Sequence, residues 1–195
     1  MDDPLLDRHG EALDLFTDRV HAVGADQWRA GTPCAEWSVR DLVNHLTAEQ
    51  LWVPPLVSEG RTMAEVGDAF DGDVLGEDPV ATWDRAAAAA RAAFAERGAL
   101  ERAVQLSYGR TPVAAYCAQM VLDAVVHTWD LSRGIGVNER LPGPLVDFAL
   151  EEVEPYAGGL SSSGLFDAPL KPPPGADAQT RLLAMLGRES GPSAG

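Results

Sequence analysis

The 195-residue sequence predicts an all-α fold, a single bundle of four long helices joined by one long crossover. In four long segments, apolar residues recur at steps of three and four, which is typical of amphipathic helices that pack on one another. No segment shows convincing strand alternation. Hydrophobic residues make up 46% of the chain, so a core can form. We expect one domain over residues 1–187 and a disordered tail over residues 188–195.

The first two helices carry clear start signals. Asp3 is expected to cap the first helix, with Pro4 at its first position. Ser38 and Asp41 form a pair that resembles a capping box and predict the start of the second helix. We expect this second helix to end before the pair Pro54-Pro55, because proline lacks the backbone N–H that a helix interior needs.

The rest of the chain continues the helical pattern. Residues 56–77 lack periodicity and are expected to form the crossover, and residues 102–110 read as an extended arm. An alanine run gives the third helix high intrinsic propensity. The sequence predicts the remaining helices, including two extra C-terminal ones, at residues 79–97, 112–134, 144–155 and 178–188.

Charge and composition exclude some classes of protein. The formal net charge is −15 and the basic residues are scattered, which argues against nucleic-acid binding. The N-terminus lacks the features of a signal peptide, and the apolar stretches fall short of the ~20 residues of a membrane helix. We therefore expect a cytoplasmic protein without a membrane partner. The sequence is also compatible with a homodimer. Cys34 and Cys117 are expected to be buried or partly buried thiols without an assigned role.

Three polar side chains stand in strongly apolar helical surroundings. Asp123 and His127 are four residues apart and so share one helix face. His45 lies in a similar setting on the second helix. If these helices face each other, His45, Asp123 and His127 form a three-ligand divalent-metal site with an open position. The alternative is a local hydrogen bond between the acid and the histidine.

Several other polar residues each have more than one possible role. Glu49 fits a catalytic acid or base, or a group that orients a ligand histidine, or a plain surface acid. Asp130 fits a partner of His127 or a residue of the helix packing. A pocket mouth could include Arg40, Gln50, Trp52 and Tyr108, although Trp52 also fits the core. His9 and His21 are expected to be solvated on the first helix.

Three stretches resemble a known family: "TPCAEWSVRDLVNHLTAEQLW", "MVLDAVVHTWDLSRGIG" and "GADAQTRLLAMLGRES". They are similar to the DinB / mycothiol-dependent maleylpyruvate isomerase-like superfamily, in particular its actinobacterial metal-binding branch. The resemblance implies a DinB-like four-helix bundle with a long crossover. It also implies a metal triad of one histidine on the second helix and an acid-xxx-His pair on a later helix, which are here His45, Asp123 and His127.

The resemblance further implies an enzyme that uses a low-molecular-weight thiol such as mycothiol. The thiol would be activated on the metal for transfer to, or isomerisation of, an electrophilic small molecule. Zinc is the expected metal, with nickel or iron as alternatives. Asp123 stands where isomerase-type members carry Glu, and the chain is expected to end without the isomerase's extra domain, so the substrate stays open. The alternatives are a metal-dependent hydrolase using bound water and a non-catalytic metal-binding scaffold.

Overall fold

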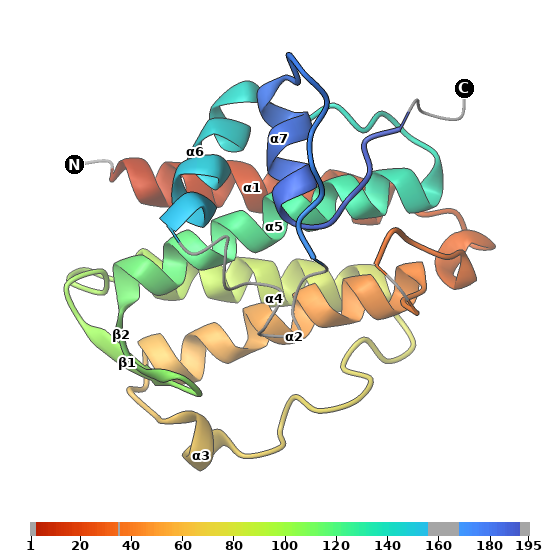
Figure 1. Cartoon of the computed structure of the whole chain (residues 1–195). Helices are drawn as coiled ribbons and strands as arrows, with labels where there is room; N and C mark the ends of the chain where they lie inside the picture. The colour runs from red at the N-terminus through yellow and green to blue at the C-terminus, as the bar shows by residue number, and fades with distance from the viewer. Residues whose placement is uncertain (1–2, 35, 156–167, 192–195) are drawn as a thin grey trace.

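The computed structural model describes residues 3–34, 36–155 and 168–191. Its centre is a bundle of four helices, α1 (Pro4–His21), α2 (Val39–Val57), α4 (Pro79–Phe94) and α5 (Val113–Ile135) (Figure 1). The helices α1 and α2 each pack against both α4 and α5. The all-α, DinB-like bundle that the sequence predicts is therefore confirmed.

The predicted helix starts are confirmed at the level of single hydrogen bonds. Asp3 accepts a hydrogen bond from the Leu5 N–H at 2.9 Å and caps α1. Ser38 and Asp41 form a complete capping box at the start of α2, since each side chain accepts from the other's backbone N–H. These local signals fix where α2 begins and hence where its polar residues point.

The predicted end of α2 is wrong. The helix continues through Pro54 and Pro55 to Val57. Prolines interrupt the donor side of the hydrogen-bond ladder, but the Pro54 carbonyl still accepts from the Ser58 N–H at 2.9 Å. Burial of Leu56 and Val57 in the core holds this last turn together, an effect that local sequence cannot show.

The crossover between α2 and α4 contains one short helix, α3 (Met63–Val66). Side chains of α2 tie it down: Arg40 pairs with Asp73 at 2.8 Å, and Asn44 donates to the Gly72 carbonyl at 2.8 Å. Because Asn44 adjoins His45 in the chain, the crossover is anchored next to a predicted site residue.

The stretch expected as an extended arm is a β-hairpin. Strands β1 (Ala103–Leu106) and β2 (Gly109–Pro112) pair antiparallel, with Val104 opposite Thr111. Four-residue strands are too short for alternation to stand out in the sequence. The hairpin leads directly into α5.

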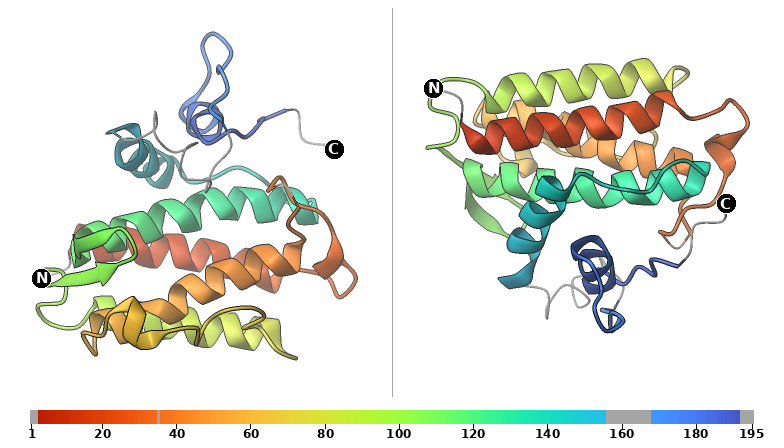
Figure 2. Two further views of the ribbon diagram at one scale, coloured as in Figure 1. Left: turned by 60° about the horizontal axis from the view of Figure 1, so that its bottom comes forward. Right: turned by 90° about the horizontal axis from the view of Figure 1, so that it is seen from above.

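The two C-terminal helices, α6 (Gly143–Val153) and α7 (Ala178–Met185), form a layer outside α5 (Figures 1 and 2). Their leucines, among them Leu182 and Leu183, join the bundle core. Arg188, just after the predicted domain end at residue 187, is largely buried and contacts Asp130 of α5. Parts of the expected loop and tail, residues 156–167 and 192–195, lie outside the described residues.

A short 3₁₀ turn, η1 (Gln27–Arg29), and a loop connect α1 to α2. An isolated bridge between Gly31 and Ser38 closes this loop, and the Val39 N–H donates to the Ala30 carbonyl at 2.8 Å. The loop packs closely on α5, since a Cβ at Gly134 would lie 3.3 Å from the Gly31 oxygen. Cys34 and Trp37 are thereby held against the bundle.

The expectation that His9 is solvated is wrong. Its side chain is in the core at 1% exposure, with its ring 4.9 Å from the Phe94 ring. The helix α1 is covered by both α4 and α5, so its buried face is wider than its apolar stripe. His21 is partly exposed and pairs with Asp84 at 2.9 Å. None of the described helices is long and apolar enough to cross a membrane.

Candidate metal centre

The three predicted ligands come together between α2 and α5. His45 Nε2 lies 3.6 Å from Asp123 Oδ2, and His127 Nε2 lies 3.3 Å from Asp123 Oδ1. One ligand atom from each residue lies within 4.8 Å of the other two. Asp123 and His127 are thus neighbours on one face of α5, and α2 brings His45 next to them.

These separations fit a divalent metal. Two ligands at about 2.1 Å from a tetrahedral zinc ion lie about 3.4 Å apart, close to both measured distances. Two imidazole nitrogens and a carboxylate oxygen suit zinc, and they also suit nickel or iron. We therefore retain His45, Asp123 and His127 as the predicted metal ligands.

The three predicted ligands differ in their exposure to solvent. The His127 side chain is 7% exposed, whereas those of Asp123 and His45 are 22% and 28% exposed. The Trp37 ring lies 4.9 Å from that of His45. A ligand can therefore approach from the side of Asp123 and His45, while His127 forms the floor of the site.

The charges in the site oppose the effect of burial. Burial alone would lower the pKa of His127, but the Asp123 carboxylate outweighs it and raises that pKa well above its usual range. Burial alone would raise the pKa of Asp123, but His127 and His45 lower it strongly. In the absence of a metal, these groups form a buried ion pair in which the His127 proton occupies the cation's place.

Glu49 lies one turn beyond His45 on α2 and is partly buried. Burial, and then the negative charge of Asp123, raise the pKa of its carboxyl group. An acid whose pKa is raised toward neutrality can accept and return a proton. The candidate role of Glu49 as acid or base is therefore physically reasonable and stays a prediction.

Behind the site, Asp130 orients His127. It is fully buried, and its Oδ2 accepts a hydrogen bond from His127 Nδ1 at 2.9 Å. Burial opposes ionisation, but the His127 and Arg188 hydrogen bonds prevail and lower the Asp130 pKa to about 2. The sequence left two roles open for Asp130, and the structure supports the first, a hydrogen-bond partner of His127. Because His127 Nδ1 binds Asp130, His127 Nε2 is left facing the other two predicted ligands.

Two residues near the site were given no role there by the sequence, Cys34 and Arg188. The Cys34 thiol donates to Asp130 Oδ2 at 3.3 Å and lies 3.8 Å from His127 Nδ1. Arg188 donates to the same carboxylate at 2.7 Å. Cys34, His127 and Asp130 form a second group with ligand-like spacing, but the Arg188 guanidinium already supplies the cation there and would repel a metal ion.

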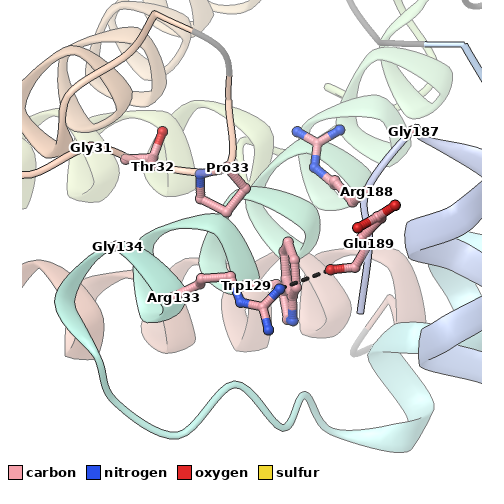
Figure 3. Close-up of a pocket in the computed structure, with 9 residues that line it drawn as sticks. All are labelled: Gly31, Thr32, Pro33, Trp129, Arg133, Gly134, Gly187, Arg188 and Glu189. Atoms are coloured by element: carbon pink, nitrogen blue, oxygen red, sulfur yellow. Dashed lines mark hydrogen bonds between the residues drawn. The ribbon is translucent and has the colours of Figure 1, made fainter. Parts of the chain in front are cut away.

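A cavity of about 410 Å³ lies beside this rear network (Figure 3). Trp129 and Arg133 of α5 line it, with the Arg133 guanidinium 4.8 Å from the centre of the Trp129 ring. None of the three predicted ligands lines the cavity. It therefore belongs to the back of the site and not to the open side.

The residues proposed for a pocket mouth separate in the structure. Arg40 binds the crossover, and Trp52 packs edge-on against Phe70 at 5.2 Å. Gln50 is fully buried, and its amide has no hydrogen-bond partner among the described residues. Tyr108 at the hairpin tip is exposed and donates to Gln119 of α5, so it alone keeps an exposed position.

Comparison with known proteins agrees with this architecture. The profile of the family described as mycothiol maleylpyruvate isomerase N-terminal domain matches residues 9–132, a range that contains all three predicted ligands. Uncharacterised proteins from two strains of Mycobacterium tuberculosis are each 30% identical over 139 residues, covering 71% of either chain. No solved structure is significantly similar to the chain. The chain belongs to the mycothiol maleylpyruvate isomerase N-terminal domain family, a DinB-like family of metal-binding proteins.

Proposed function

We propose that the protein is a divalent-metal enzyme that activates a low-molecular-weight thiol, with mycothiol as the first candidate, for reaction with an electrophilic small molecule. The observation that carries the proposal is the one-sided cluster of two imidazole nitrogens and a carboxylate at ligand spacing. The chain belongs to a family whose description names a mycothiol maleylpyruvate isomerase, and this supports a thiol as the co-reactant.

In this proposal His45, Asp123 and His127 hold the metal, which when bound would lower the pKa of a thiol at its open position. Asp130 keeps the His127 Nδ1 proton fixed, so that Nε2 is available as a ligand. Glu49 accepts the thiol proton, in keeping with its raised pKa. Trp37, next to His45, limits access of water from one side.

The metal ligands can be tested by substitution. We expect one zinc per chain, and we expect His45→Ala and His127→Ala to abolish binding while the helical circular-dichroism spectrum is retained. His21→Ala is the matched control, because His21 is a partly exposed histidine away from the site. Full metal content in a His45→Ala/His127→Ala protein would overturn the assignment.

Thiol binding can be tested with the cobalt-substituted protein. A new cobalt–sulfur bond should add a charge-transfer band in the near ultraviolet when mycothiol is added. The band should survive in Cys34→Ser, because the Cys34 thiol faces Asp130 and not the open side. If metal binds but neither mycothiol nor another cellular thiol changes the spectrum, the thiol proposal fails and a hydrolase or a non-catalytic scaffold takes its place.

A further inference from the structure

We propose that Arg188 is a positioning residue of the metal centre, and that the C-terminal segment around it and the metal stabilise each other's binding. The inference rests on the proposed metal site and adds a partner for it that lies far away in the chain. Arg188 is 58 residues from Asp130 and follows α7, the last helix of the C-terminal layer.

The contact between Arg188 and Asp130 is two-pronged. Arg188 Nε donates to Asp130 Oδ1 at 2.9 Å, and a terminal nitrogen donates to Oδ2 at 2.7 Å. Another terminal nitrogen donates to the Leu186 carbonyl at 2.9 Å, which fixes the guanidinium relative to its own segment. A planar guanidinium with two parallel bonds fixes the plane of a carboxylate, which a single bond does not do.

That plane matters because Asp130 Oδ2 also accepts the Nδ1 proton of His127 at 2.9 Å. The direction of this bond sets the rotation of the imidazole and thus where Nε2 points. With the Asp130 carboxylate free to turn, the Nε2 lone pair would spread over a range of directions. Arg188 therefore acts on the predicted ligand through Asp130.

The same segment is held by two other arginines that do not reach the site. Arg133 donates to the carbonyls of Glu189 and Gly191 at 2.8 and 2.9 Å. Arg140 pairs with Asp177, the residue that caps α7, at 2.7 Å. These contacts separate two functions: Arg133 and Arg140 only dock the segment, while Arg188 docks it and also orients Asp130.

Such an arrangement couples two binding events. If docking of the segment improves metal affinity by some factor, metal binding must improve docking by the same factor. Loss of an outer partner of a ligand histidine usually lowers metal affinity about 10–100-fold. Because Arg188 acts one residue further out than Asp130, we expect the lower end, about tenfold.

The first experiment measures zinc affinity by competition with a chromophoric chelator. Arg188→Ala and Arg188→Lys should each weaken binding about tenfold, since lysine keeps the charge but lacks the planar fork. Arg133→Gln is the matched control: it loosens the same segment but leaves the Arg188–Asp130 contact in place, so its zinc affinity should fall by much less than tenfold. Ethylguanidinium at a low, non-denaturing concentration should restore affinity to Arg188→Ala and should not affect the wild type.

The second experiment measures the reverse effect by hydrogen exchange. Zinc should slow exchange of the amides of residues 178–186 in the wild type and in Arg133→Gln, and should not slow it in Arg188→Ala. Circular dichroism establishes that each variant is folded, and Arg188→Lys replaces Arg188→Ala if the latter is not. Equal zinc affinity in wild type, Arg188→Ala and Arg188→Lys would overturn this inference and leave the metal site standing, whereas a wild type that binds no metal would overturn both.

Discussion

His9 on α1 and His127 on α5 are both buried histidines of the same bundle, yet their surroundings are opposite. His127 lies between two carboxylates, those of Asp123 and Asp130. His9 packs edge-on against Phe94, and its Nε2 has no hydrogen-bond partner among the described residues. The pKa of His127 is therefore raised well above its usual value, and that of His9 is lowered to about 4 by burial and then by Arg91.

The difference shows that burial alone does not decide what a histidine does. Burial penalises the imidazolium at both positions, but only at His127 do carboxylates at steps of four and three residues compensate for it. In the metal-free protein, protonated His127 contributes stability that is lost as pH rises through its raised pKa. His9 acts in the opposite direction, because its stability contribution is lost as pH falls below the unfolded-state value.

The strongest predicted change is in zinc affinity, and it should separate His127 from His9. His127→Gln should lower zinc affinity by more than about 100-fold, beyond the usual effect of losing an outer partner. His9→Gln should leave zinc affinity unchanged, since His9 lies in the apolar core. Isothermal titration with zinc measures both, and a similar loss in the two variants would mean that metal binding reports only on general stability.

The second prediction concerns acid stability. With a pKa of about 4 in the folded protein and about 6.5 unfolded, His9 should destabilise the fold by about 2 kcal/mol at pH 5 relative to pH 8. His9→Leu should remove this loss. Urea unfolding with chelator present, at both pH values, gives the difference. His9→Gln should flatten the pH dependence of the free energy of unfolding as well. If both variants keep the wild-type pH dependence, the lowered pKa of His9 is not its cause.

The third prediction concerns helix stability at the N-terminal caps of α1 and α2. Ser38→Ala at the start of α2 and Asp3→Ala at the start of α1 should each reduce stability by about 1 kcal/mol. Only Ser38→Ala should also weaken zinc binding, because α2 carries His45. Thermal melts and zinc titrations of the two variants provide the test, and equal zinc affinity in both would separate His45 placement from the cap.

The sequence was informative about helix starts and about spacing within a helix, where the signal is local. The caps at Asp3 and Ser38 depend on neighbours within three residues, and both were predicted. The four-residue spacing of Asp123 and His127 places them on one face of any helix. The sequence could not show that His45 on α2 faces Asp123 and His127 on α5. Only the resemblance to a known family indicated that these three residues belong to one site.

Long-range packing accounts for what the sequence did not predict. Arg188 lies in irregular backbone past the last helix, and Cys34 is 154 residues away from it, so no periodicity connects them. His9 was misplaced because its burial depends on which helices cover α1. The turn through Pro54 and Pro55 survives because residues after it are buried, a gain that propensity rules do not include.

The ion pair of Asp130 and Arg188 has a consequence for charge balance. The two cancel, so under the proposed function Asp123, Glu49 and a divalent cation remain, and with both carboxylates ionised the total is zero. A thiol that gives its proton to Glu49 leaves the total at zero, since the sulfur gains the negative charge that Glu49 loses. Creating net charge in a poorly hydrated site is costly. By neutralising Asp130, Arg188 keeps the net charge of the site at zero both before and after this proton transfer, whereas an unpaired Asp130 would leave one uncompensated negative charge.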